Sequence, residues 1–157
     1  MKIIVYALNF KPDLIGVGKY TGELADYLYD KGHELQVITA PHYYPDWESE
    51  KNSYFLDKDS AYKIFRCPIY IPKNPNGIKR IMHLISFSIT SFPVLIAQLK
   101  WNPNCIILIA PSLLCALNSF IFRLFFKKKL LCLLHIQDFE LDAAFDLKIV
   151  RVKFLKR

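Results

Sequence analysis

A glycine-rich stretch near the start of the sequence could contact an anion. Gly16-Val17-Gly18-Lys19-Tyr20-Thr21-Gly22 opens a segment with helical spacing. Helix N-terminal amides carry partial positive charge, and glycine lets the backbone approach a ligand closely, so the stretch is a candidate phosphate contact. The third glycine comes one residue late for a dinucleotide fingerprint, and Asp13 and Tyr20 break the Walker A pattern. A tight strand-to-helix turn without a ligand is the alternative.

A second candidate segment begins with His135-Ile136-Gln137-Asp138, directly after the last predicted strand. A histidine in this position can contact a sugar hydroxyl or a phosphate, and it can transfer a proton near neutral pH. Asp138 could orient His135 or a nearby loop. We therefore treat His135 and Asp138 as candidate catalytic residues. The alternative is structural, with Asp138 as the N-cap of a following helix.

Three aromatic residues, His42, Tyr43 and Tyr44, lie in a loop between Pro41 and Pro45. This loop could contact an acceptor molecule or could pack on the domain. His33, at a helix-to-strand turn, and His83, within an apolar helix, are weaker candidates. No Ser/His/Asp or Cys/His set is recognisable. The four cysteines form no C-x-x-C pair, which predicts reduced core thiols and no metal site.

Strand and helix patterns alternate along the chain and position these residues. The apolar patterns predict strands over residues 2–8, 33–40, 61–67, 105–110 and 130–135, helices over 18–31, 78–100 and 111–126, and a long loop over 41–60. Such alternation indicates an α/β fold with a doubly wound parallel sheet. Sites in such sheets lie at the carboxyl ends of strands, here after Leu8, after Ala40 and from His135 onward.

The charge is distributed unevenly over 157 residues with a net charge of +7. Residues 1–78 carry nine basic and ten acidic side chains, and residues 79–157 carry twelve and four. A basic, apolar half fits anionic lipid headgroups better than nucleic acid, although solvated loop lysines would give the same count. Residues 81–99 lack charge and could span a membrane, but their Ser, Thr, Gln and Pro93 favour a buried or surface-lying helix.

Several of these segments together resemble a known family. The residues are Asn9-Phe10-Lys11-Pro12-Asp13 with Gly16 to Glu23, then Lys31-Gly32-His33-Glu34 with Val37 to Pro41, Tyr43-Tyr44-Pro45, and His135 to Asp138. In order and spacing they resemble the N-terminal domain of family 4 glycosyltransferases, in particular the colanic-acid-type fucosyltransferase group. The resemblance covers residues 1–146.

This resemblance implies a Rossmann-like sheet, the N-terminal half of a GT-B fold, in an enzyme that moves a sugar from a nucleotide-sugar donor. The donor is a substrate, and neither a cofactor nor a metal is required. The glycine loop would approach the donor diphosphate and His135 the donor sugar. The domain would hold a lipid-linked glycan acceptor at the cytoplasmic, inner face of the plasma membrane, in exopolysaccharide or lipopolysaccharide synthesis. The candidate substrate-binding residues are Gly16, Val17, Gly18, Lys19, Tyr20, His42, Tyr43 and Tyr44.

The sequence also departs from the family. Residues 147–157 form a basic tail unlike it, and we expect the C-terminal donor-binding domain to be absent from this chain. We therefore expect a single domain that is inactive alone and works with a separate C-terminal-domain chain. A truncated remnant, or a non-catalytic module that binds a membrane surface or an acceptor, are the alternatives.

Overall fold

The computed structural model describes residues 1–14, 16–57, 60–110, 114–125 and 130–137. Its strands are β1 (Lys2–Tyr6), β2 (Glu34–Thr39), β3 (Phe55–Asp57), β4 (Lys63–Arg66), β5 (Cys105–Ile109) and β6 (Leu131–His135). Its helices are α1 (Gly16–Asp30), α2 (Gly77–Ala97) and α3 (Leu114–Phe125), and a 3₁₀ turn, Gln98–Trp101, follows α2. The predicted α/β fold is confirmed.

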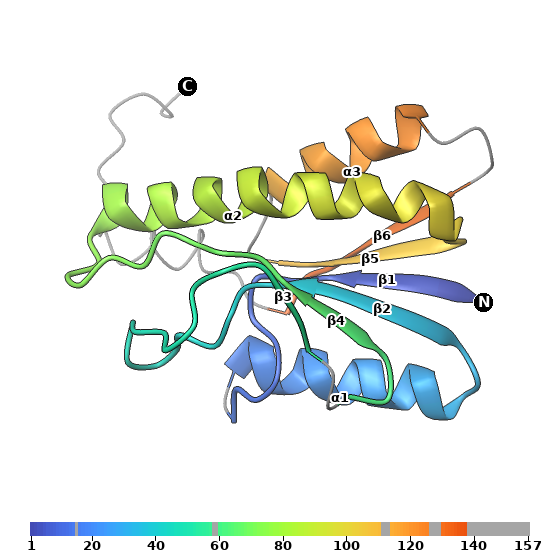
Figure 1. The fold of residues 1–157 in the computed structure, drawn as a ribbon, viewed down its shortest axis with the longest axis horizontal. Coiled ribbons are helices and arrows are strands. Elements are labelled where there is room, and N and C mark those ends of the chain that lie inside the picture. The colour runs from blue at the N-terminus through green and yellow to red at the C-terminus, as the bar shows by residue number, and fades with distance from the viewer. Residues whose placement is uncertain (15, 58–59, 111–113, 126–129, 138–157) are drawn as a thin grey trace, which may run out of the picture.

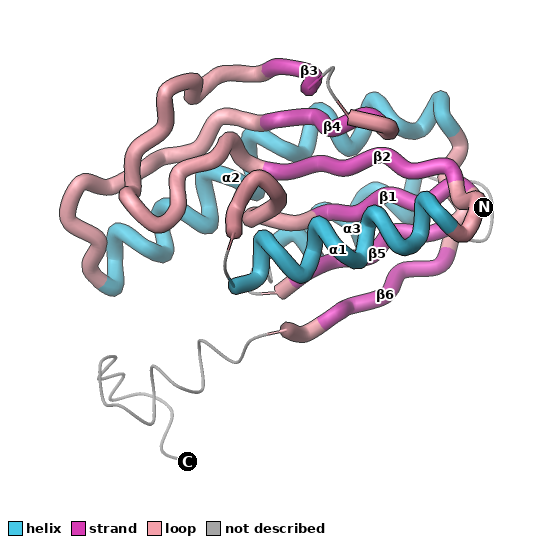
Figure 2. The backbone as a smooth tube through the Cα atoms, turned by 90° about the horizontal axis from the view of Figure 1, so that it is seen from below, coloured by secondary structure: helices cyan, strands magenta, loops and turns pink. Residues whose placement is uncertain are grey.

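The six strands form one sheet in the order β3-β4-β2-β1-β5-β6 (Figure 2). All neighbours are parallel except β3 and β4. β1 lies in the middle, where Ile4 pairs with Gln36 of β2 and with Ile106 of β5. Central parallel strands are covered on both faces, which explains why β1, β2 and β5 are nearly continuous apolar runs.

Helices cover both faces of the sheet, with α1 on one side and α2 and α3 on the other (Figure 1). Side chains of β1 alternate between the two layers. Ile3 and Val5 belong to the core cluster that Ala25 of α1 joins, whereas Ile4 and Tyr6 belong to the cluster of α2 and α3. The doubly wound arrangement expected from the sequence is therefore present, and the long loops gather at one end of the sheet (Figure 2).

The prediction of an uninterrupted loop over residues 41–60 is wrong. β3 forms inside it and pairs antiparallel with β4, so that Leu56 opposes Phe65. The short segment Phe55–Asp57 has no buried residue and no apolar alternation, because it is an edge strand held by backbone pairing. Two helix boundaries also differ. α1 begins at Gly16 rather than residue 18, and α2 ends at Ala97, where the chain tightens into the 3₁₀ turn.

α2 lies across the sheet with a buried stripe and an exposed stripe. Asn76 caps its start, where the side chain accepts a hydrogen bond from the Lys79 amide at 3.0 Å. The buried stripe consists of His83, Phe87, Ser91 and Leu95, and the exposed apolar side chains are Ile78, Ile81, Met82, Ile85 and Ile89. By length and composition alone, the helical stretch 77–101 could cross a membrane. Its inner stripe packs on the sheet, where Phe87 and Leu95 join the core.

A buried polar cluster connects β1 to both helices above it. The hydroxyls of Tyr6 and Ser91 lie 2.5 Å apart, and Asn118 of α3 donates to the Tyr6 hydroxyl at 2.9 Å. Ser91 also donates to the carbonyl of Phe87, one turn earlier in α2. These contacts fix the positions of α2 and α3 relative to the central strand.

The four cysteines are free thiols, in agreement with the sequence-based prediction. Cys67, Cys105 and Cys115 are buried, and Cys132 is half-buried. Burial raises the pKa of the Cys67 thiol to about 12. These side chains act as small apolar residues of the core.

Candidate functional site

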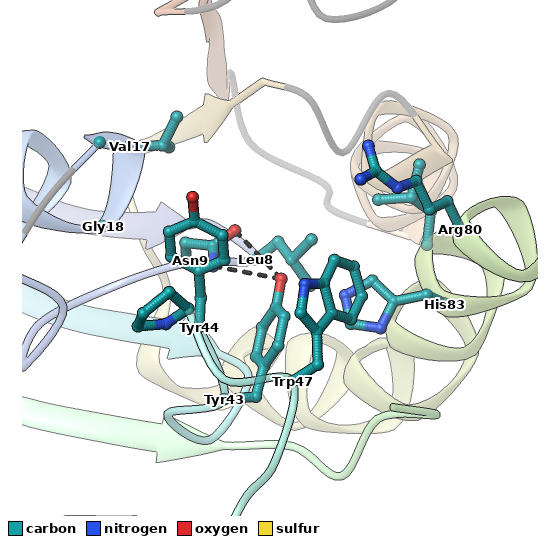
Figure 3. Close-up of a pocket in the computed structure, with 12 residues that line it drawn as sticks. Leu8, Asn9, Val17, Gly18, Tyr43, Tyr44, Trp47, Arg80 and His83 are labelled. Atoms are coloured by element: carbon teal, nitrogen blue, oxygen red, sulfur yellow. Dashed lines mark hydrogen bonds between the residues drawn. The ribbon is translucent and has the colours of Figure 1, made fainter. Parts of the chain in front are cut away.

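A cavity of about 450 Å³ opens at the carboxyl ends of β1 and β2. It lies between the start of α1 and the first turns of α2, and the loop after β2 forms its floor (Figure 3). The residues around it are Leu8, Asn9, Gly16, Val17, Gly18, Tyr43, Tyr44, Pro45, Trp47, Arg80, His83 and Leu84. This is the end of the sheet at which parallel α/β folds bind ligands.

Five of the eight predicted substrate-binding residues surround this cavity: Gly16, Val17, Gly18, Tyr43 and Tyr44. Gly16, Val17 and Gly18 form the start of α1, and Tyr43 and Tyr44 lie in the loop after β2. Because both segments follow the carboxyl ends of neighbouring parallel strands, they lie close together in the fold although more than twenty residues separate them in the sequence.

The two glycines at the start of α1 serve different purposes. Gly16 has a φ of +61°, a conformation that other residues adopt only with strain, and the space beside its Cα is open. Gly18 has an ordinary φ, but a Cβ there would collide with the Asp13 carboxylate. The absence of a side chain at Gly18 thus makes room for Asp13, whereas Gly16 faces the cavity.

Asp13 connects the loop after β1 to the loop after β2. His42 donates to its carboxylate through Nδ1, and Asn9 donates through Nδ2 at 3.4 Å. Burial raises the pKa of Asp13, and the hydrogen bond from His42 opposes this rise. Arg66, itself buried, donates to the carbonyls of Lys11 and Ala40 and so joins the same two loops from below. Sequence reasoning assigned no role to Asp13.

The remaining predicted residues lie elsewhere. Lys19 and Tyr20 are exposed and are not among the residues that line the cavity, and Lys19 Nζ lies 3.8 Å from Oε1 of Glu23. His42 borders a second cavity, of about 620 Å³, together with Asp46, Glu48 and Glu50. His135 is exposed at the end of β6, where Ile109 is its neighbour in β5. Asp138 lies outside the described residues. The roles of these residues therefore stay predictions.

The wall formed by α2 contains Arg80, which sequence reasoning missed, and His83, which it treated as a weaker candidate. His83 is buried and its ring contacts Tyr43 and Trp47, with centroid distances of 4.7 Å and 5.2 Å. The Arg80 guanidinium lies 5.8 Å from the Trp47 ring at the mouth of the cavity (Figure 3). His83 falls in an apolar run, so the pattern indicated a core position. Only its spacing of three residues from Arg80 could have placed both on one helix face.

The residues that line the cavity include both aromatic rings and polar groups. Aromatic rings supply apolar area, and Asn9, Arg80 and the Tyr44 hydroxyl supply a few polar groups. In the part of the chain that the structure describes, no three His, Cys, Asp or Glu side chains are grouped as metal ligands.

The chain is 45% identical over 151 residues to WcaI of Escherichia coli (strain K12), which is named as a colanic acid biosynthesis glycosyl transferase. The match covers 94% of this chain and 36% of WcaI, so the chain spans about a third of the length of that relative. No protein-family model matches the sequence, and no solved structure matches it.

A parallel α/β sheet with a cavity at its carboxyl edge is shared by proteins of many functions, so the fold alone identifies nothing. The sequence match extends over nearly all of the chain. Together, the match and the mostly parallel six-stranded sheet support a glycosyltransferase N-terminal domain of the colanic-acid type.

Proposed function

We propose that this domain is the acceptor-side half of a glycosyltransferase that moves a sugar from a nucleotide-sugar donor to a lipid-linked glycan in exopolysaccharide or lipopolysaccharide synthesis. The similarity to WcaI carries the proposal, because that relative is named as a glycosyl transferase of colanic acid biosynthesis. The cavity supports it, since its mixture of aromatic rings and few polar groups suits a sugar.

The proposed reaction needs a second domain. The chain matches only 36% of WcaI. Transfer requires groups placed around both reactants, because much of the rate comes from holding them in one geometry. A donor-binding domain, in the same polypeptide or in a separate chain, would supply the groups that bind the nucleotide, and no metal would be required.

In the assembled enzyme, the start of α1 would face the donor diphosphate. Gly16 leaves open space beside the first amides of a 15-residue helix, whose dipole favours an anion there. His135 would contact the donor sugar from the end of β6, and Asp138 would orient that histidine. These roles follow from the family resemblance.

A chimeric enzyme tests this proposal. Residues 1–137 are joined to the remaining part of WcaI, and transfer to a polyprenyl-linked lipid extract is measured with a panel of UDP- and GDP-sugars. We expect transfer from one donor and a loss of at least about a hundredfold in His135→Ala, as for other positioned polar groups. His33→Ala is the matched control, because His33 lies at a turn near the other end of the sheet. No transfer from any donor, in a chimera that folds, would refute the proposal.

The exposed stripe of α2 favours a second, compatible function, in which the domain lies on the inner membrane surface. Ile78, Ile81, Met82, Ile85 and Ile89 recur at helical spacing and are 40% to 74% exposed. Lys79 and Arg80 adjoin the stripe, and basic residues beside an apolar helix face are typical of helices that lie on anionic bilayers.

Vesicle sedimentation tests the membrane function. The chain should bind vesicles that contain phosphatidylglycerol, and salt should weaken the binding because headgroup attraction is screened. The double variant Ile81→Asp/Ile85→Asp should reduce binding by about tenfold or more. Tyr27→Asp, an exposed position on α1 at the opposite face of the sheet, is the control. Equal binding by both variants would exclude α2 as the membrane face.

A further inference from the structure

Among the described residues, one ring nitrogen of His83 has a hydrogen-bond partner and the other has none. Nδ1 lies 2.5 Å from the carbonyl oxygen of Tyr70. A carbonyl can only accept, so Nδ1 carries the hydrogen of this bond. Burial lowers the pKa of His83, which keeps the ring neutral at physiological pH. In a neutral ring protonated at Nδ1, Nε2 is a hydrogen-bond acceptor.

No described residue donates to His83 Nε2, although the atom is buried. Buried polar atoms nearly always have a partner, and an exception in a native fold calls for an explanation. The side chain of His83 has an exposed fraction of only 3%, and it forms part of the cavity wall. The unused acceptor therefore belongs to the wall of a cavity that could admit its donor.

Trp47 packs against the His83 ring in the wall of the cavity. Its indole lies 5.2 Å from the His83 ring and 5.6 Å from the Tyr43 ring, between the loop after β2 and α2 (Figure 3). Trp47 is half-buried and has a φ of +56°, which is rare for a bulky side chain. Such backbone strain is frequent at sites where ligands bind. Trp47 is thus the member of the wall suited to move.

The kind of ligand follows from the chemistry of these groups. An unused acceptor selects a donor such as a hydroxyl and disfavours a phosphate or carboxylate, whose oxygens only accept. Two aromatic rings beside it provide apolar area for a ring-shaped ligand. We propose that His83 Nε2 accepts a hydrogen bond from a hydroxyl of the acceptor sugar, and that the Trp47 indole moves aside to admit it. That this sugar is the acceptor rests on the proposed function, whereas recognition of a sugar hydroxyl rests on the cavity alone.

Sugar binding to the 157-residue chain tests the inference. The variant Trp101→Phe leaves Trp47 as the sole indole, since the chain has two tryptophans. Methyl α-D-glucopyranoside, methyl α-D-galactopyranoside and methyl α-L-fucopyranoside are titrated against Trp47 fluorescence, with tetrahydropyran as the ring that lacks hydroxyls. We expect a saturable change with at least one glycoside and binding at least about tenfold weaker for tetrahydropyran, because a site built for a hydroxyl rejects an analogue without it.

One variant of His83 and a matched control distinguish the role of Nε2 from that of Nδ1. His83→Asn places an amide where Nδ1 stood and can still donate to Tyr70, but it has no atom at Nε2. We expect it to fold and to bind the glycoside at least about tenfold more weakly. His33→Asn is the matched control outside the cavity and should bind normally. In the unmodified chain, the ¹⁵N resonance of His83 Nε2 should shift upfield on addition of the glycoside, which tests the contact without any variant at His83.

The outcomes distinguish this inference from the proposed function. Equal binding by His83→Asn, an unmoved Nε2 resonance, or no saturable binding of any glycoside over its solubility range would overturn the inference. In the chimeric enzyme, His83→Asn should raise the acceptor KM with little change in kcat. Normal transfer with an unchanged KM would refute the role of His83 while the proposed function stands. Glycoside binding that depends on His83, in a chimera that transfers no sugar, would refute the function alone.

Discussion

His42 donates a hydrogen bond from Nδ1 to Asp13 Oδ1 across 2.5 Å, although 29 residues separate the two in the sequence. The carboxylate is almost fully buried, whereas the His42 ring is half-exposed. The bond joins the loop after β1 to the loop after β2, and these are the loops that surround the main cavity. The bond therefore connects the ends of two neighbouring strands.

Replacement of His42 should therefore destabilise the domain. His42→Ala removes the donor from a buried carboxylate, and the free energy of unfolding should fall by about 1–3 kcal/mol, the cost of leaving such a group unsatisfied. Urea unfolding followed by circular dichroism measures the change. His33→Ala, whose ring lies 3.4 Å from the N-terminal amine at an exposed position, should change stability by less than about 0.5 kcal/mol. Equal losses in the two variants would mean that the His42 bond contributes nothing.

Gly16 and Gly32 form a natural pair for separating function from stability. Both have positive φ, +61° and +79°, and the space beside each Cα is open, but only Gly16 borders the cavity. Gly16→Ala and Gly32→Ala should each cost about 1–2 kcal/mol, because a Cβ is strained in the left-handed region. In the chimeric enzyme, only Gly16→Ala should also lower kcat/KM.

One result of comparing Gly16→Ala with Gly32→Ala would contradict a role of Gly16 in the site. If both variants lower kcat/KM in proportion to their loss of stability, the glycine loop acts only as a turn. The measurement requires urea unfolding and initial rates on the same preparations, with the rates taken where both variants are fully folded.

The order of strands and helices could be predicted because each long element has its own periodicity. The runs Lys2–Tyr6 and Cys105–Ile109 are buried on both faces and are typical of central parallel strands by their composition alone. β3 could not be predicted, since a three-residue edge strand depends on pairing with β4 rather than on its own side chains. The local pattern of apolar residues therefore predicts the strands and helices that bury side chains in the core. It does not predict a strand that forms only by pairing with a neighbouring strand.

The site was predictable in part for the same reason. The rule that ligands bind at the carboxyl ends of parallel strands selected the loops with Gly16 and Tyr43, and both border the cavity. It could not select Asp13, whose role depends on a long-range bond to His42, or His83, which approaches from α2. A helix that crosses the sheet contributes side chains according to its packing angle, and the sequence does not encode that angle locally.

Tyr6→Phe should show how much the buried polar cluster contributes to holding α2 and α3. Its hydroxyl contacts Ser91 at 2.5 Å and Asn118 at 2.9 Å, and burial raises the pKa of Tyr6 far above its ordinary value. Loss of the hydroxyl should cost about 1 kcal/mol, because Ser91 and Asn118 keep other partners in the Phe87 and Ser88 carbonyls. Tyr27→Phe, an exposed position, should be neutral in the same urea titration. A neutral Tyr6→Phe would show that the cluster adds no net stability.

His83 should make the domain less stable as the pH falls below neutral. Burial is the main cause that lowers its pKa below the ordinary 6.5, and the Arg80 charge lowers it further, while the bond to the Tyr70 carbonyl opposes them. Between the native pKa and 6.5, the unfolded chain therefore binds a proton that the native chain does not. The free energy of unfolding should fall as pH drops below 6.5, by at most about 1.4 kcal/mol per pH unit for one group.

The contribution of His83 is isolated by comparing pH 7.5 with pH 5.5 in the original chain and in His83→Asn, with urea unfolding as the measurement. Asp13 acts in the opposite direction, since its raised pKa makes the native carboxyl the better proton acceptor as pH falls. Because Asp13 is present in both proteins, its effect cancels in the difference. The loss on acidification should be smaller in His83→Asn than in the original chain. An equal loss in both would mean that His83 is not held neutral by the cavity wall, and the buried Nε2 acceptor would then lack its physical basis.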